Sequence, residues 1–512
     1  MGNSRPVSEG NPPAGVRGTP GRLLVLAVLL QAALGVYRAW IVVSELPGLA
    51  PSLLGRAGEA GAFSSLPFAL ALVAVATAAA FRAGGSSARR LAAAGLAGLL
   101  ALAGAGLALT VAGVATGRLV PAGAWAVVAL GLAAALLVPR RREEERSPAG
   151  LSAWDAATLL FLLALLVPAV FPYVHFDARA IWGCRALAVA GSGSLASLGE
   201  CSHGSYPPLF SLLLALGGKD PVLGGRLVAW LLAVFSALFL RGAFARLSPR
   251  HAAAATLFVV STGWVWVSSA MYYANVPLMA FLAGGAVLVL GEVPRARGDA
   301  APGLPARLAG ALLLAAAVLV RPDGWIYAGA LGSAAAFLAL GGRARPDFLP
   351  FAGAALGWCT WALRPDLLRF TNTFTEHAST WRTAGATGTE AVRRIVAVSL
   401  HVLQGLWLAH WGLGLTIWVL LFAAVAALRR GRAASGATVA WGVTAFAGLA
   451  TVLALYAVLP FTVDVVAGVG LDPPKDFLGS WENFARVGVG RMVVHLLPAG
   501  AFFVLAVVED AD

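Results

Sequence analysis

Asp177 is the residue of this sequence best suited to chemistry, and it lies in the stretch FPYVHFDARAIWGCRAL. A carboxylate there can accept a proton from a hydroxyl group, hold a metal ion, or pair with Arg179 or Arg185. The alternative is an ordinary solvated residue. An ionisable group in so apolar a chain is costly unless it is paired or hydrated, so its presence slightly favours a function.

Two further segments carry polar residues that could contact a substrate. His203 and Tyr206 lie in HGSYPPLF, where the paired prolines restrict the backbone and predict the start of a helix. RPDG, at 321–324, has the composition of a turn between two apolar runs. A turn does not require both Arg321 and Asp323, however, and an arginine suits a phosphate group.

The segment GVGRMVVHLLP, near the end of the chain, places Arg491 and His495 four residues apart and so on one face of a helix. Arg491 could bind a ligand, or its side chain could simply extend towards a membrane surface. For His495 the sequence favours a packed interior residue over a functional one.

The three cysteines do not form a metal-binding pattern with the histidines. Cys184 and Cys201 fall in the same loop and could form a disulfide, which would staple the loop rather than catalyse. Cys359 stands in an apolar run and is expected to pack there. No nucleotide-binding, serine-hydrolase or zinc-protease motif is present, and a divalent metal at Asp177 remains an open alternative.

The elements that must position these residues are apolar helices. Of the 512 residues 59% are hydrophobic and 12% charged, and the mean hydropathy is +0.81. Soluble domains carry about 25% charged residues. Apolar runs of ~17–25 residues predict an all-α, polytopic transmembrane bundle of about fourteen spans. The spans are expected to begin near Leu23, Pro67, Leu91, Ala122, Ala153, Leu223, Ala252, Val276, Leu308, Trp325, Leu349, Gly412, Ala437 and Gly490.

The distribution of basic residues predicts the topology. A net charge of +13 could suggest a nucleic-acid partner, but the basic residues lie mostly in short loops after alternate spans. That is the pattern of cytoplasmic loops, so we expect a membrane protein with both termini cytoplasmic and no nucleic-acid partner. Loops 171–221, 364–410 and 461–489 then face the extracytoplasmic side, and the apolar segment after Tyr206 should form a helix at the interface or dipping into it.

Three regions follow from these patterns. Residues 1–21 are polar and rich in Gly and Pro, and we expect a disordered cytoplasmic tail. The apolar run after them has the character of a retained helix rather than a signal peptide. Residues 22–150 form an N-terminal four-helix membrane region without an assigned role, and residues 151–512 form the core that carries the motifs above.

The order of these motifs resembles the GT-C superfamily of integral-membrane glycosyltransferases. The chain looks closest to bacterial members of the dolichyl-phosphate-mannose mannosyltransferase and aminoarabinose-transferase type. HFDARAIWGCRAL matches an acidic motif followed by W..KA, with Arg185 where lysine is usual, and HGSYPPL matches the next element. YYANVPLMA, RPDG and GVGRMVVHLLP match three later elements, with Asn275 in place of an acid.

The resemblance implies an enzyme of the bacterial inner membrane and cell envelope. A sugar would pass, with inversion, from a polyprenyl-phosphate donor to a lipid or glycan acceptor on the outer face. Asp177 would be the general base, whereas Asn275 coordinates weakly and cannot act as a base. The substrate-binding residues would be Arg179, Arg185, His203, Tyr206, Asn275, Arg321, Asp323 and Arg491.

Two other classes of protein remain open. A transporter or lipid flippase would carry internal repeats, broken helices and ionisable residues near the middle of the bilayer. The sequence shows no repeat, and charges within its spans are scarce. A non-catalytic relative that has kept the fold is the third possibility, which the amide at Asn275 favours.

Overall fold

The protein is helical throughout the residues that its computed structural model describes, as the sequence predicts. These residues are 19–44, 66–83, 86–137, 152–170, 178–201, 206–216, 221–270, 273–290, 303–321, 323–341, 346–362, 415–431, 434–458 and 492–511. The predicted outer loops at 364–410 and 461–489, and most of the predicted tail, lie outside them.

Helices begin within a few residues of every predicted span. The first part of the chain contains α1 (Thr19–Ser44), α3 (Leu66–Ala83), α4 (Ser87–Thr116), α5 (Pro121–Leu137) and α6 (Ala153–Val170). The loop after α6 contains η1 (Ala178–Gly183), α7 (Cys184–Ser192), η2 (Leu195–Glu200) and α8 (Leu209–Ala215).

The later helices follow in the same close agreement. They are α9 (Pro221–Leu247), α10 (Ala252–Ser261), α11 (Gly263–Ala270), α12 (Asn275–Leu290), α13 (Leu304–Val320) and α14 (Gly324–Leu340). After these come α15 (Leu349–Ala362), α19 (Thr416–Arg430), α20 (Gly436–Val458), η4 (Val494–Leu496) and α23 (Leu497–Glu509).

Three of the described helices are long and apolar enough to cross a membrane, namely Leu66–Ala83, Ser87–Thr116 and Gly225–Leu247. Shorter apolar helices of 10–17 residues account for most of the other predicted spans. The helices thus agree with a membrane protein, whereas the number of about fourteen spans remains a prediction.

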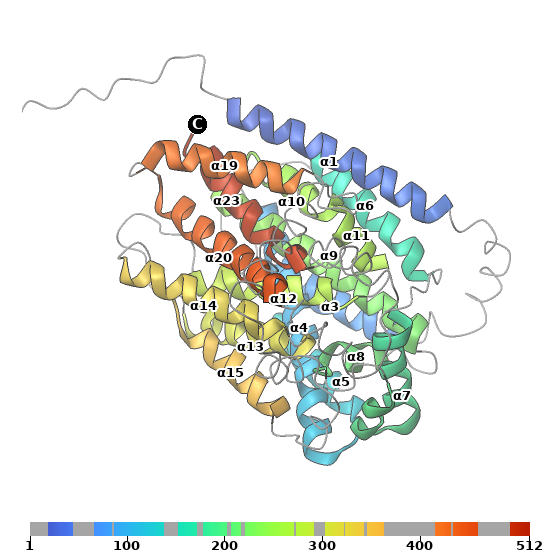
Figure 1. Ribbon diagram of the computed structural model, residues 1–512. Coiled ribbons are helices and arrows are strands. Elements are labelled where there is room, and N and C mark those ends of the chain that lie inside the picture. The colour runs from blue at the N-terminus through green and yellow to red at the C-terminus, as the bar shows by residue number, and fades with distance from the viewer. Residues whose placement is uncertain are drawn as a thin grey trace, which may run out of the picture.

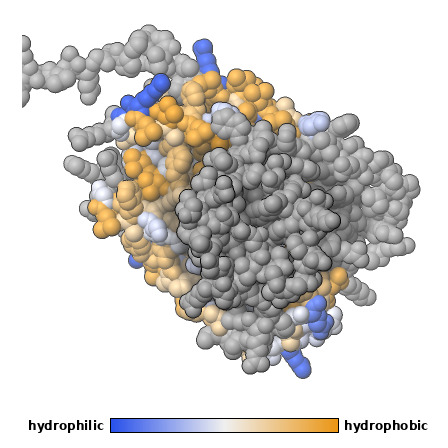
Figure 2. Space-filling model, viewed as in Figure 1, coloured by the Kyte–Doolittle hydropathy of each residue, from blue (hydrophilic) through white to orange (hydrophobic). Residues whose placement is uncertain are grey.

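The surface of the bundle carries many exposed apolar side chains, drawn in orange in Figure 2. Large aliphatic and aromatic residues are exposed along α1, α3 and α19 in particular, with Leu30, Leu70 and Phe422 as examples. Soluble monomers rarely expose continuous apolar patches larger than a few hundred Å². A surface of this kind suits contact with lipid tails.

The interior of the bundle is built around α4 and α9, which make the most extensive helix pair. In Figure 1 α4 runs through the middle of the molecule, while α1 lies along one outer edge over α10. The short helix α8 packs against both α4 and α9, and all seven of its residues are buried. The helix after the paired prolines is therefore confirmed and is covered by protein, whereas its position at the membrane interface stays a prediction.

Polar contacts join the helix termini at each end of the bundle. At one end, which we call the Asp155 end, they link termini that the loop charges assign to one face: Arg241 with Asp155, Arg307 with Asp347, and Thr438 with Asp510. At the opposite end, which we call the Arg321 end, Arg118 pairs with Ser194 in an isolated antiparallel bridge and Arg321 contacts Asn275. The contacts agree with helices that alternate in direction.

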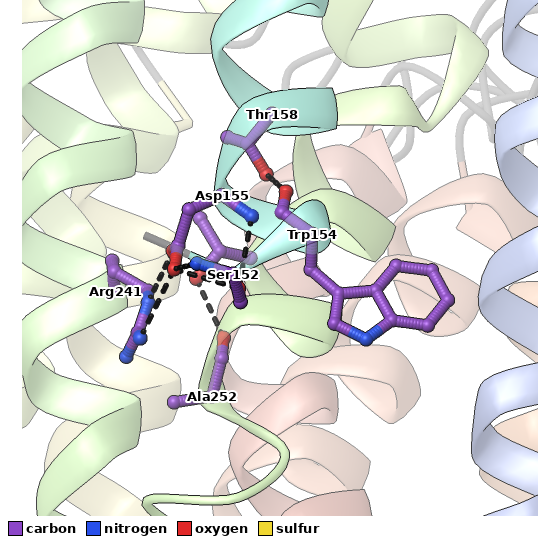
Figure 3. Close-up of polar contacts among 7 residues, drawn as sticks. Ser152, Trp154, Asp155, Thr158, Arg241 and Ala252 are labelled. Carbon is purple, nitrogen blue, oxygen red and sulfur yellow. Dashed lines mark hydrogen bonds and ion pairs between the residues drawn. The ribbon is translucent and has the colours of Figure 1, made fainter. Parts of the chain in front are cut away.

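Asp155 is held by its own helix terminus and by α9 (Figure 3). The Ser152 hydroxyl accepts a hydrogen bond from the Asp155 N–H at 3.2 Å, and the Asp155 carboxylate accepts one from the Ser152 N–H at 3.1 Å. This reciprocal arrangement is a capping box, which satisfies two N–H groups at the start of α6. The Arg241 Nε donates to the same carboxylate at 2.7 Å and so ties α6 to α9.

Candidate functional site

Arg321 joins three segments that are far apart in the sequence. Its Nε donates to the Asp323 carboxylate at 2.9 Å, and one terminal nitrogen donates to the Asn275 side-chain oxygen. The other terminal nitrogen lies 3.9 Å from the Met492 sulfur. Since α12 begins at Asn275 and α14 follows Asp323, the guanidinium holds the termini of both helices and the segment before η4 together.

Burial of this cluster carries a desolvation cost for its charged and polar groups. Asn275 and Asp323 are only 1% and 2% exposed, and the Arg321 side chain is 20% exposed. Buried charges are tolerated when they are paired and hydrogen-bonded, as Arg321 and Asp323 are. The Asn275 amide also donates to the Ser268 hydroxyl at 3.3 Å, which extends the cluster to α11. The arrangement places one partly exposed cation at the Arg321 end, with its orientation fixed from several sides.

An aromatic layer lies beneath this cluster. The Tyr327 hydroxyl donates to the Met492 carbonyl oxygen at 3.0 Å, and the rings of Tyr327 and His495 meet edge to face at 4.9 Å. His495 is buried, and neither of its ring nitrogens has a hydrogen-bond partner among the described residues. It lines a small cavity of about 30 Å³ between α12, α14, α20 and α23. The expected packed histidine is thus buried as predicted, although its polar atoms are unsatisfied.

The loop between α6 and α9 is closed by a disulfide between Cys184 and Cys201, whose Cα atoms are 5.9 Å apart. The sequence left this pairing open, and the structure shows it. The bond links the first residue of α7 to the residue that follows η2, so the two short helices form a single stapled unit. A cross-link of this kind restricts the unfolded chain more than the folded one.

Arg185 lies at the centre of the same loop and is fully buried. One terminal nitrogen donates to the Tyr206 carbonyl oxygen, and the guanidinium lies 6.0 Å from the centre of the Trp182 ring. Its Nε and its other terminal nitrogen have no partner within the part of the chain that is described. Burial lowers the pKa of the Arg185 guanidinium to about 9, so the group is still charged at neutral pH. A buried cation with unpaired N–H groups favours the binding of an anion.

The structure brings together some of the residues predicted from the sequence. Asn275, Arg321 and Asp323 form one cluster through their side chains. Arg185 and Tyr206 form a second cluster in the loop, where the Trp182 ring lies 6.0 Å from the Tyr206 ring.

Four predicted residues cannot be assigned contacts. Asp177, His203 and Arg491 lie outside the described residues, and Arg179 is described only by its backbone, in η1. This short π-helical segment begins immediately after Asp177 and leads directly into α7. Such segments are rare and often occur at functional sites. Because Asp177 itself lies outside the described residues, its role remains a prediction.

Three residues of the Arg321 cluster were not predicted. Met492 immediately follows Arg491 in the last motif, but a thioether carries no signal of polar chemistry. Tyr327 lies four residues after Asp323, one turn further along α14, and that spacing could have identified it. Ser268 is one of many hydroxyl residues in apolar helices, and nothing in the sequence distinguishes it.

Groups of three or more His, Cys, Asp or Glu side chains that could hold a metal ion do not occur among the described residues. The cluster around Arg321 instead combines one cation, one carboxylate and one amide. Such a set can attract an anionic group to its partly exposed face through the charge of Arg321.

Comparison of the chain with known protein families, with curated proteins and with solved structures found no match.

Proposed function

We propose that the chain is a membrane glycosyltransferase that moves a sugar from a polyprenyl-phosphate donor to a lipid or glycan acceptor. The observation that carries the proposal is the convergence at Arg321 of three motifs that suggested the resemblance. Asn275 is 46 residues away in the sequence and Met492 is 171 residues away, yet both contact the same guanidinium. Motifs that were matched separately in the sequence thus support one site.

The chemistry assigned to this site is a direct displacement. The acceptor hydroxyl oxygen attacks the anomeric carbon and forms the new glycosidic bond, and the bond from that carbon to the phosphate oxygen breaks. Its electron pair leaves with the phosphate, and Asp177 takes the hydroxyl proton. Because attack and departure occur on opposite faces, the anomeric configuration is inverted.

Stabilising the departing phosphate is the main electrostatic task of such a reaction. Two arginines support it. Arg321 is partly exposed and held in position, while Arg185 is buried with two unpaired N–H-bearing nitrogens. Asn275 serves as a hydrogen-bond acceptor for Arg321 rather than as a base, which accounts for an amide where related motifs carry an acid.

Orientation in the membrane follows from the disulfide and from the loop charges. Disulfides form in oxidising compartments, which in bacteria means the extracytoplasmic side of the inner membrane. The Cys184–Cys201 bond therefore supports an extracytoplasmic location for the loop after α6. In this proposal both termini are cytoplasmic, about fourteen spans cross the bilayer, and the Arg321 end faces outwards.

The first prediction concerns transfer by the Asp177→Asn variant. Full-length protein in nanodiscs would be given a panel of radiolabelled polyprenyl-phosphate sugars together with an extract of envelope lipids and glycans. Loss of a general base should lower the transfer rate ~10²–10⁴-fold. Asp347→Asn is the matched control, because Asp347 pairs with Arg307 at the opposite end of the bundle, and its transfer rate should not change. Full transfer by Asp177→Asn would remove this residue from the chemistry.

The same preparation separates the proposal from the transporter alternative. One observation favours transport, since the span predicted from Ala252 is broken at Thr262, between α10 and α11. A transporter or flippase would move intact donor across a proteoliposome membrane without forming product. A non-catalytic relative would bind the donor and do neither. Formation of a glycosylated product that depends on Asp177 contradicts both alternatives.

A further inference from the structure

We propose that α4 and the turn after it are a positioning scaffold for the loop that carries Asp177. The N-terminal membrane region, residues 22–150, then belongs to the working site instead of being an addition to it. The inference deepens the proposed function, and its activity measurement depends on that function. Its structural measurements do not.

Backbone hydrogen bonds join the turn after α4 to the loop. The Leu119 N–H donates to the Gly193 carbonyl oxygen at 2.7 Å, and the Leu195 N–H donates to the Gly117 carbonyl oxygen at 3.0 Å. Gly117 ends α4 with φ 72°, and Gly193 ends α7 with φ 64°. Both are left-handed conformations that favour glycine. Each helix thus ends in a turn that leads the chain into the antiparallel bridge between Arg118 and Ser194.

Side-chain packing along α4 adds two further contacts. Leu195 lies against Gly113 and Leu209 lies against Gly106, so close that a Cβ atom on either glycine would come within 2.7 Å of the leucine side chain. Both leucines are fully buried, so neither can move aside into solvent. Leu195 begins η2 and Leu209 begins α8, and α4 therefore fixes the starting points of both short helices.

The described part of the loop is tied together internally. The Cys184–Cys201 disulfide joins α7 to the end of η2, and the Arg185 side chain joins α7 to the Tyr206 carbonyl oxygen before α8. Since η1 runs directly into α7 and begins one residue after Asp177, the position of this unit sets where the chain leaves Asp177.

The scaffold is itself continuous with the core. Gly95 and Gly98 of α4 lie directly against Phe239 and Phe235 of α9, and Gly242 of α9 lies against α4 in return. Such contacts between small residues allow close approach of helices in membranes. Displacement at the α4–loop contact would consequently move the loop relative to the Arg321 cluster and not carry the cluster with it.

The test is Gly113→Leu and Gly106→Leu in the full chain, with Gly131→Leu as the matched control. Gly131 lies on α5, where the nearest atom to an added Cβ is 3.7 Å away. Hydrogen exchange in residues 184–200 should rise in both test variants and stay at the wild-type level in the control. Transfer by the test variants should fall on the order of 10²-fold in kcat, because a shift of about 1 Å in a catalytic group costs that much.

A disulfide cross-link between the turn after α4 and the loop tests the same contact without requiring a leucine variant to fold. Arg118→Cys and Ser194→Cys, combined with Cys359→Ser, place two thiols across the bridge. The bonded pairs on either side make this a narrow position, with a Cα separation of about 4.5 Å, which suits a disulfide. A protease site inserted after Arg142 allows detection, since the two fragments should stay together on a non-reducing gel.

The outcomes separate this inference from the proposed function. Absence of transfer by the wild-type protein with every donor would contradict the function, whereas exchange and cross-linking would still report on the scaffold. Separation of the fragments under oxidising conditions would overturn the scaffold. Normal exchange and normal kcat in folded Gly113→Leu and Gly106→Leu proteins would overturn it as well.

Discussion

Arg321 holds several residues of the candidate site in position and is itself held by them. Its guanidinium contacts a carboxylate, an amide oxygen and a thioether from three separate segments. A fixed, planar cation with several donors is the role for which arginine is better suited than lysine. Its charge is partly balanced by Asp323, so a phosphate ligand would meet a preorganised hydrogen-bonding surface rather than a full unpaired charge.

The second prediction concerns the stability contribution of this arginine. Arg321→Met leaves the buried Asp323 carboxylate without its ion-pair partner, and breaking a buried pair costs about 3–5 kcal/mol. Arg307→Met is the matched control, because the Arg307 side chain is 40% exposed and exposed ion pairs contribute little to stability. Thermal unfolding in nanodiscs measures both.

Adding Asp323→Asn to Arg321→Met should recover part of the loss, since it removes the stranded charge. Equal effects of Arg321→Met and Arg307→Met on the unfolding temperature would contradict the structural role given to Arg321.

At the residue scale the sequence anticipated the polar members of the site better than their partners. RPDG carries two opposite charges that a turn does not need, which indicates a role for both, and Arg321 does contact Asp323. The contact with Asn275 could not be predicted, since it depends on how α12 and α13 pack. Arg185 was noted as a possible partner of Asp177, but its burial against Trp182 depends on the folded loop.

At the scale of elements, the broken helix α10–α11 is pinned by α1. The Gln31 side chain of α1 donates to the Thr262 hydroxyl at 3.1 Å and accepts a hydrogen bond from the Leu415 N–H at 3.1 Å. Gly35, one turn further along α1, lies against the Ser261 carbonyl oxygen. One amide therefore joins α1, the helix break and the start of α19.

The third prediction follows from this contact. Gln31→Leu should lower the free energy of unfolding by about 1–3 kcal/mol, because it leaves buried polar groups without partners. Hydrogen exchange should increase in α11 and in the first turn of α19. Leu30→Ala, on the exposed side of the same helix, is the control and should affect neither region. Unchanged exchange at α11 in Gln31→Leu would show that the break does not depend on α1.

The break between α10 and α11 was not predicted from the sequence. The apolar run from Ala252 continues through Thr262, and a threonine is tolerated within a membrane helix. At the break, the Thr262 hydroxyl accepts a hydrogen bond from Gln31, 231 residues away, and the next helix begins at Gly263. Helix starts, by contrast, depend on local composition, which is why α9, α12 and α15 begin where expected.

At the scale of the whole molecule, polar contacts join the helix termini at the two ends of the bundle. Exposed apolar side chains occupy the surface between them, as Figure 2 shows for one face. Loop charges and the disulfide both favour an extracytoplasmic Arg321 end. The alternating direction of the helices was predictable from charge, whereas the choice of neighbours, such as α4 with α9, required the structure.

The fourth prediction concerns sidedness. Arg118→Cys and Arg250→Cys, each combined with Cys359→Ser, place a thiol at an exposed position at opposite ends of the bundle. A membrane-impermeant maleimide should label Arg118→Cys in intact cells and Arg250→Cys only after permeabilisation. The remaining cysteines, Cys184 and Cys201, are protected by their disulfide. The reverse labelling pattern would place the Arg321 end in the cytoplasm.

The contact between Asp155 and Arg241 also bears on how the chain is made. The two residues are 86 positions apart, so the ribosome produces α6 well before the arginine that neutralises its carboxylate. A lone carboxylate enters the hydrocarbon layer at a considerable cost. We therefore expect the start of α6 to stay at the water boundary during synthesis and to take its final place only when α9 arrives. The Asp155–Arg241 pair can thus form only after α9 has been made.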